Sequence, residues 1–333
     1  MKIIEKLKNN KKLYCLLKTI KNCKNDNFCQ QVIDINSHPL SLTVRSFGEL
    51  NKETVIYYCD MVEYYYAGFC ATLMNCLRNL YVPYLLDIPT VVNWHAQLYI
   101  DPYDNRGENP FVYYFNQPFG ISENDAEISK NVIISRHVDG MMWEGLNKYE
   151  QNDRSVDFYS KVYKRYISLN KETCGMLSDD GVFNLRDQPT IGVHVRGTDF
   201  NASWKNHPLP VTPEQYLDAT LKLMQETRTE RVFLATDDIN ALNLFVDKLG
   251  DKLIYYADTN RTTGNDGVHT QESDEPGHKY RLGYEILRDV YSLAYCDYLV
   301  AGLSNVGHVA RIIAHSMDKD FKKCVILSEG IKK

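Results

Sequence analysis

The sequence predicts an α/β protein with a parallel sheet in its second half. Short runs rich in β-branched and aromatic residues alternate there with longer segments of helical periodicity, which is typical of a parallel sheet covered on both faces. Hydrophobic residues make up 44% of the chain and charged residues 24%, an ordinary globular composition. At roughly 100 to 200 residues per domain, the length predicts two domains, which we place at 1–183 and 184–333.

The second half contains five expected strands and the helices that connect them. The strands are expected at 190–195, 231–236, 252–257, 297–302 and 322–328, and the helices at 212–227, 240–250, 280–296 and 305–316. Thr212 and Gln215 form the pattern of a capping box, and Gly250 suits a helix C-cap. A polar segment over 258–278, with glycines and His269, predicts a flap over a bound ligand.

The first half is less regular and carries most of the 24 tyrosines. A strand is expected at 53–59, a helix from Gly68, and one long helix over 155–177. Aromatic side chains bury area while keeping a polar tip, so the tyrosines indicate either a sugar-binding surface or a tyrosine-rich core. The candidates for a sugar-binding surface are Trp94, Tyr99, Tyr113 and Tyr114.

Charge and cysteine content exclude some classes of protein. The net charge of -5 argues against a broad nucleic-acid-binding surface. The nine cysteines are odd in number and include no CxxC pair, which favours a reducing, cytoplasmic compartment over a disulfide framework or a zinc site. The lysine-rich segment 1–24 resembles no signal peptide. It is either a basic amphipathic helix on an anionic membrane or a helix packed on the protein.

The stretch IGVHVRGTDF ends a hydrophobic strand on polar residues. Ligands of parallel sheets bind beyond the carboxyl ends of the strands, where Arg196 falls. Its guanidinium matches a phosphate in two parallel hydrogen bonds, and Gly197 would let the backbone approach such a ligand. The alternative is a structural ion pair between Arg196 and Asp199.

Two other strand exits in the same half carry polar side chains. Asp237 and Asp238 follow the strand at 231–236, where they are candidates for ribose contacts, a metal site or a helix cap. Ser304 and Asn305 follow the strand at 297–302 and suit either a phosphate or a helix cap.

Asp289 lies inside an apolar helical pattern, and a buried carboxylate needs a partner. A guanine base offers two parallel donors to a carboxylate, from N1 and N2, whereas adenine has no such edge. The alternative is a salt bridge from Arg281 or Arg288.

Taken in order, HVRGTD, ATDD and ILRDVYSLAYCDYLVAGLSN resemble the second domain of the fucosyltransferase superfamily, over about 188–315. That group includes the core α1,6-fucosyltransferase of N-glycans, the nodulation-factor fucosyltransferase and the protein O-fucosyltransferases. The resemblance implies a GT-B fold, with two Rossmann-like domains facing across a cleft. It also implies GDP-fucose as donor, a glycan acceptor, inversion at the anomeric carbon, and no metal or other cofactor. Segment 109–118 resembles bacterial relatives from polysaccharide loci, which implies an acceptor in surface-polysaccharide or lipid-linked oligosaccharide synthesis.

The resemblance also implies roles for individual residues. Arg196 would hold the β-phosphate of the donor. The remaining donor contacts would be His194 and Asp289 at guanine, Asp238 near the nucleotide, and Ser304 and Asn305 at the phosphates. Gly197 stands where some members have a second arginine.

One departure from the superfamily concerns the general base. Trp204 occupies the position of the base glutamate of the N-glycan enzyme, so a base must come from elsewhere, with Asp199, His207 and His269 as candidates. Two alternatives stay open: a transferase of another GDP-sugar such as GDP-mannose, and a non-catalytic GDP-sugar or glycan-binding protein.

Overall fold

A computed structural model describes residues 41–61, 67–101, 103–137, 151–197, 208–263, 268 and 273–330. Within these residues the strands form two sheets, and the predicted α/β class is confirmed. The first sheet has the order β1-β4-β2-β3, built from β1 (Ser41–Arg45), β2 (Leu50–Asp60), β3 (Thr90–Asn93) and β4 (Ser129–His137). Strands β4, β2 and β3 are parallel, and β1 joins the edge antiparallel to β4.

The second sheet is parallel throughout. Its strands are β5 (Thr190–Val195), β6 (Arg231–Thr236), β7 (Leu253–Ile254), β8 (Tyr298–Gly302) and β9 (Lys323–Leu327), in the order β7-β6-β5-β8-β9. Numbered along the chain, this order is 3-2-1-4-5, the arrangement of a Rossmann sheet. The Rossmann-like second half is therefore confirmed, although the strand expected at 252–257 keeps only two residues.

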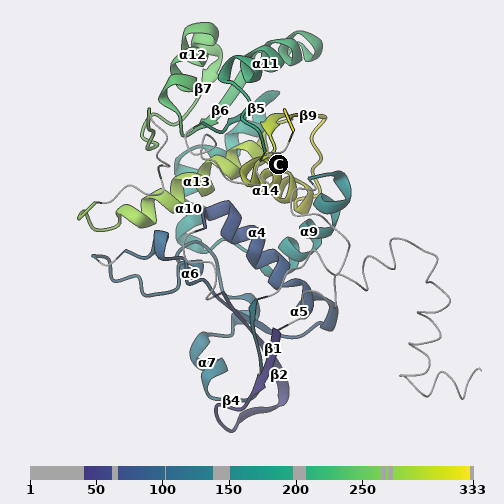
Figure 1. The fold of residues 1–333 in the computed structure, drawn as a ribbon, viewed down its shortest axis with the longest axis vertical. Helices are drawn as coiled ribbons and strands as arrows, with labels where there is room; N and C mark the ends of the chain where they lie inside the picture. The colour runs from purple at the N-terminus through teal and green to yellow at the C-terminus, as the bar shows by residue number, and fades with distance from the viewer. Residues whose placement is uncertain are drawn as a thin grey trace, which may run out of the picture.

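The helices cover the sheets in layers. They are α4 (Phe69–Asn79), α5 (Tyr81–Leu86), α6 (Phe111–Tyr114), α7 (Glu123–Glu127), α9 (Asp153–Tyr166), α10 (Lys171–Asp179), α11 (Pro213–Thr227), α12 (Ile239–Leu249), α13 (His278–Tyr295) and α14 (Asn305–Ser316). Figure 1 shows α11 and α12 on the outer face of the second sheet, and α13 and α14 between that sheet and α4 and α9. No helix in the described ranges is both long and apolar enough to span a bilayer.

Local signals for helix ends are confirmed where the sequence predicts them. Thr212 and Gln215 form the capping box of α11, Gly250 follows α12 as its C-cap, and α14 covers the expected residues. The single helix expected over 155–177 is wrong. The chain breaks into α9 and α10 because Leu169 makes an extended bridge to Phe115, and Asn170 caps the new helix by accepting from the Thr173 amide at 2.8 Å.

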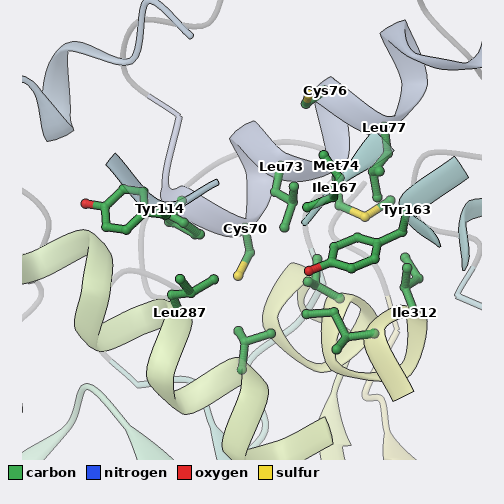
Figure 2. Close-up of a cluster of buried hydrophobic side chains, with 14 of the residues drawn as sticks. Cys70, Leu73, Met74, Cys76, Leu77, Tyr114, Tyr163, Ile167, Leu287 and Ile312 are labelled. Atoms are coloured by element: carbon green, nitrogen blue, oxygen red, sulfur yellow. The ribbon is translucent and has the colours of Figure 1, made fainter. Parts of the chain in front are cut away.

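A continuous hydrophobic core joins the two halves. It runs from β2 through α4 and α9 to α13 and α14. Figure 2 shows Leu73 and Leu77 of α4 and Tyr163 of α9 facing Leu287 of α13 and Ile312 of α14. The core crosses the expected boundary between 183 and 184, and the division into two domains stays a prediction.

The aromatic residues of the first half belong to this core. Trp94, Tyr99 and Tyr114 are fully buried, and Tyr113 is 3% exposed. The Trp94 and Phe69 rings meet edge to face at 5.6 Å. The tyrosine-rich core is thus the correct interpretation, and the expectation that these four residues line a sugar site is wrong.

Candidate functional site

The strand order of the second sheet reverses between β5 and β8. In open α/β sheets, ligands bind in the crevice beyond the carboxyl ends of the strands at such a reversal. Arg196 follows β5, and Ser304 follows β8, so the two predicted residues flank this crevice. A small cavity opens there. Its lining residues are Arg196, Pro208, Leu209, Val211, Tyr216, Gly302, Leu303, Ser304, Leu327 and Ser328.

Arg196 lines this cavity and lies within ion-pair distance of a carboxylate. Its side chain is 27% exposed, and Nη1 lies 3.7 Å from Oδ2 of Asp237 at the exit of β6. Asp237 also accepts a hydrogen bond from the Gly197 amide at 3.0 Å. At 3.7 Å this ion pair is longer than a charge-assisted hydrogen bond.

Gly197 and Asp238 have structural reasons to be where they are. A Cβ at position 197 would lie 2.3 Å from Cβ of Asp238, so the close approach of the β5 and β6 exits requires glycine there, and its contact with a ligand stays a prediction. Asp238 caps α12 through a hydrogen bond from the Asn240 amide at 2.8 Å. The capping interpretation of Asp238 is therefore confirmed, and its contact with a nucleotide stays a prediction.

His194 and Ser304 form a buried pair beneath the crevice. Nδ1 of His194 lies 3.1 Å from Oγ of Ser304, which accepts from the Gly307 amide and so caps α14. Asn305, the first residue of α14, is half-buried. The amides at the start of this helix can receive an anion, and the contact of His194 with guanine stays a prediction.

Asp289 forms neither of the salt bridges considered from the sequence, with Arg281 or with Arg288. Arg288 donates instead to Asp258 at 2.8 Å, and Arg281 pairs with Glu275 at 2.8 Å. Asp289 has no hydrogen bond or ion pair within the described residues, and part of its side chain stays accessible to solvent. It is a carboxylate that still needs a partner, as expected for a residue that binds donors of a ligand.

Asp289 has a raised pKa, and burial is its main cause. It raises the pKa of this carboxyl to about 7. Arg288 and Arg261 oppose the shift through their positive charges, whereas Glu285 and Asp237 add to it. A partly accessible carboxyl that titrates near neutral pH is typical of a functional site.

The first half of the chain contributes the opposite side of the site. Burial raises the pKa of the Cys70 thiol to about 12, while the charge of Arg196 lowers it and that of Asp289 raises it, so Cys70 lies within range of both charges. Figure 2 shows Cys70 projecting from α4 toward α13. The amide of Phe69, at the start of α4, donates to the Tyr99 hydroxyl at 2.6 Å. The start of α4 thus lies across from the β5 exit.

Several predicted residues lie outside the described ranges. These are Asp199, Trp204, His207 and His269. The first residues of the expected flap form hydrogen bonds with α13 and with the β6 exit. Asn260 donates twice to Glu285, at 2.8 and 2.9 Å, and the Thr262 amide donates to the Asp237 carbonyl. The flap itself stays a prediction.

A histidine–carboxylate pair in the first sheet was not predicted from the sequence. Nε2 of His95 lies 2.6 Å from Oδ1 of Asp60, at the carboxyl ends of β3 and β2. The signal was present, because both residues are polar and end or follow a hydrophobic strand, as the second-half exits do. The described residues hold no cluster of three or more histidine, cysteine or acidic side chains suited to a metal ion.

No protein-family model and no curated protein matches the chain. Among solved structures, NodZ α-1,6-fucosyltransferase soaked with GDP-fucose is 15% identical, with 78% of this chain and 92% of that one covered and a TM-score of 0.47. Fucosyltransferase NodZ from Bradyrhizobium is 16% identical, with 77% and 92% covered and a TM-score of 0.42. POFUT1 in complex with GDP is 12% identical, with 83% and 98% covered and a TM-score of 0.48.

Proposed function

We propose that the chain is a glycosyltransferase that moves fucose from GDP-fucose to a hydroxyl of a glycan. One structural observation supports this most strongly: Arg196 and Ser304 flank the strand-order reversal of a Rossmann sheet, beside the unpartnered carboxyl of Asp289. A guanidinium and a helix N-terminus suit a diphosphate, and a carboxylate suits the N1 and N2 donors of guanine. The motif resemblance over 188–315 supplies the identity of the sugar.

The chemistry follows from charge development during transfer. As the bond between the anomeric carbon and the phosphate breaks, the sugar becomes positive and the departing GDP becomes negative. Arg196 and the amides that follow Ser304 stabilise this negative charge, and each such donor is typically worth about 3 to 4 kcal/mol. We propose an inverting reaction that needs no metal ion, because the guanidinium supplies the positive charge at the diphosphate.

The setting is part of the proposal. The acceptor would be a bacterial surface polysaccharide or a lipid-linked oligosaccharide, modified in the cytoplasm. The basic segment 1–24 would hold the enzyme against the anionic inner face of the membrane.

Two measurements test the proposal. GDP should raise the melting temperature, whereas ADP and UDP should not, because adenine and uracil lack the paired donors that Asp289 accepts. Wild-type protein incubated with GDP-fucose, GDP-mannose and a glycan panel should release GDP from GDP-fucose. Release from GDP-mannose alone would favour the other transferase, and GDP binding without any release would favour a binding protein. Equal stabilisation by the three nucleotides would contradict the guanine site.

A further inference from the structure

We propose that His95 is the general base of the transfer and that Asp60 orients it. This inference rests on the proposed function and adds a general base to it. The pair lies at the carboxyl edge of the first sheet, where Asp60 ends β2 and His95 follows β3 by two residues. The two strands hold the pair in register, since Asp60 is opposite Asn93 in the parallel ladder.

The hydrogen bond selects the form of His95 that can accept a proton. An ionised carboxylate only accepts, so the 2.6 Å contact to Asp60 puts the ring proton on Nε2 and leaves a lone pair on Nδ1. Nδ1 has no hydrogen-bond partner in the described part of the chain, and the side chain is 30% exposed. The Asp60 side chain is only 14% exposed, so its carboxylate is shielded while the imidazole can reach a substrate.

The surrounding contacts connect the pair to the donor site. Trp94, the neighbour of His95, packs edge to face on Phe69. Phe69 begins α4, and the next residue, Cys70, lies within range of the charges of Arg196 and Asp289. His95 therefore belongs to the part of the first half that lies across from the β5 exit.

Each proton and electron pair in the step is accounted for. The O–H bond of the acceptor hydroxyl breaks, and its proton passes to Nδ1 of His95. The oxygen lone pair forms the new bond to the anomeric carbon of fucose. The bond between that carbon and the phosphate oxygen breaks, and its electron pair leaves with GDP. His95 then returns its proton to solvent.

The chain offers a matched control outside the site. His315 of α14 lies with Nδ1 2.7 Å from Oδ1 of Asp320, a contact of nearly the same length on the surface. His315→Gln removes a histidine from a comparable pair without touching the cleft side of either sheet.

Donor hydrolysis with and without azide tests the base. Water takes the place of the acceptor, and GDP release from GDP-fucose is measured for wild type, His95→Gln, Asp60→Asn, Arg196→Ala and His315→Gln. General bases contribute about 10²- to 10⁴-fold, so His95→Gln and Asp60→Asn should slow release by at least about 10²-fold. Their GDP affinity by calorimetry should stay within about twofold of wild type, because neither residue contacts the nucleotide.

Azide separates a base from a structural role. As an anionic nucleophile it needs no proton removed, so sodium azide should restore GDP release in His95→Gln and Asp60→Asn and yield fucosyl azide, detected by mass spectrometry. It should not restore Arg196→Ala, and His315→Gln should behave as wild type. Unchanged GDP release in His95→Gln, or a loss of release that azide does not restore, would contradict the role of His95 as general base. The proposed transferase function would still stand. Wild-type protein that neither binds GDP nor releases it would overturn the proposed function and the base with it.

Discussion

The hydroxyl of Tyr114 occupies the space where a side chain at Gly283 would lie. A Cβ at position 283 would be 2.1 Å from Oη of Tyr114, which donates to the Tyr280 carbonyl at 2.9 Å. The rings of Tyr114 and Tyr280 stack at 5.4 Å. Since α13 also carries Asp289, this contact from the first half sets the position of the helix that lines the candidate site.

Gly283→Ala should therefore destabilise the protein, although alanine favours helix. Overpacking costs typically about 1 to 3 kcal/mol, and the gain in helix propensity offsets about 1 kcal/mol of it. Tyr114→Phe removes the hydroxyl and so the closest of the contacts, although Cζ stays 2.8 Å from the added Cβ, so the double variant should lose less stability than the sum of the single ones. Urea denaturation measures all three. Strict additivity would show that the two positions do not compete for space.

Arg196→Ala should keep the fold and lose GDP-dependent stabilisation and transfer. The loss of one charged donor predicts a decrease in kcat of about 10²- to 10³-fold. Arg196→Lys should recover little, because an ammonium cannot form the two parallel hydrogen bonds of a guanidinium. Arg165→Ala is the control, since Arg165 pairs with Asp87 on the surface. Full transfer by Arg196→Ala would refute its role at the diphosphate.

The raised pKa of Asp289 predicts that the affinity for GDP depends on pH. With its pKa raised to about 7, the carboxyl is mostly protonated below neutrality and cannot accept both guanine donors. Affinity should rise roughly tenfold between about pH 6 and about pH 8, as the acceptor form becomes populated. Calorimetry across this range measures it, and Asp289→Asn should bind GDP weakly at every pH.

The same raised pKa makes the free energy of unfolding depend on pH in a defined direction. The folded protein binds the proton of this carboxyl more tightly than the unfolded chain does. The carboxyl therefore contributes to the free energy of unfolding below its unfolded pKa of 3.8, and this contribution is lost as the pH rises through about 7. Asp289→Asn should therefore become more stable relative to wild type as the pH increases through that window. A difference in unfolding free energy that stays constant would contradict the raised pKa.

Asn170→Ala tests the break between α9 and α10. Asn170 caps α10 through Thr173 and also donates to the carbonyls of Val112 and Tyr113, at 3.2 and 3.0 Å. Loss of a cap costs about 1 kcal/mol, and two further hydrogen bonds about 1 kcal/mol each, so a loss of about 2 to 3 kcal/mol is expected. Asn152→Ala, which removes the cap of α9, is the comparison, and a similar loss there would assign the whole effect to capping.

Local signals predicted the second half of the fold well. Periodicity, the capping box of Thr212 and the polar exits of the strands are properties of short segments, and they placed β5, β6, β8 and α14 correctly. The break at Leu169 depends on its bridge to Phe115, a contact distant in sequence that outweighs the helical pattern of 155–177. The Asn170 cap was a local signal that could have found it.

The candidate site was predictable in its parts but not in its pairings. The positions of Arg196 and Ser304 at the strand exits follow from the alternation of strands and helices. The contact of Arg196 with Asp237, and the choice of Asp258 by Arg288, depend on side-chain directions across the fold. The Asp60 and His95 pair was missed because strand exits were considered in one half only.

The shared interior of the two halves has a thermodynamic consequence. Because α4 and α9 contribute to the same buried cluster as α13 and α14, neither sheet can melt while the other keeps its full packing. We expect one cooperative calorimetric transition rather than two. Nucleotide entry would then require only rearrangement near the strand ends, since a large rotation of one sheet against the other would expose this cluster to water.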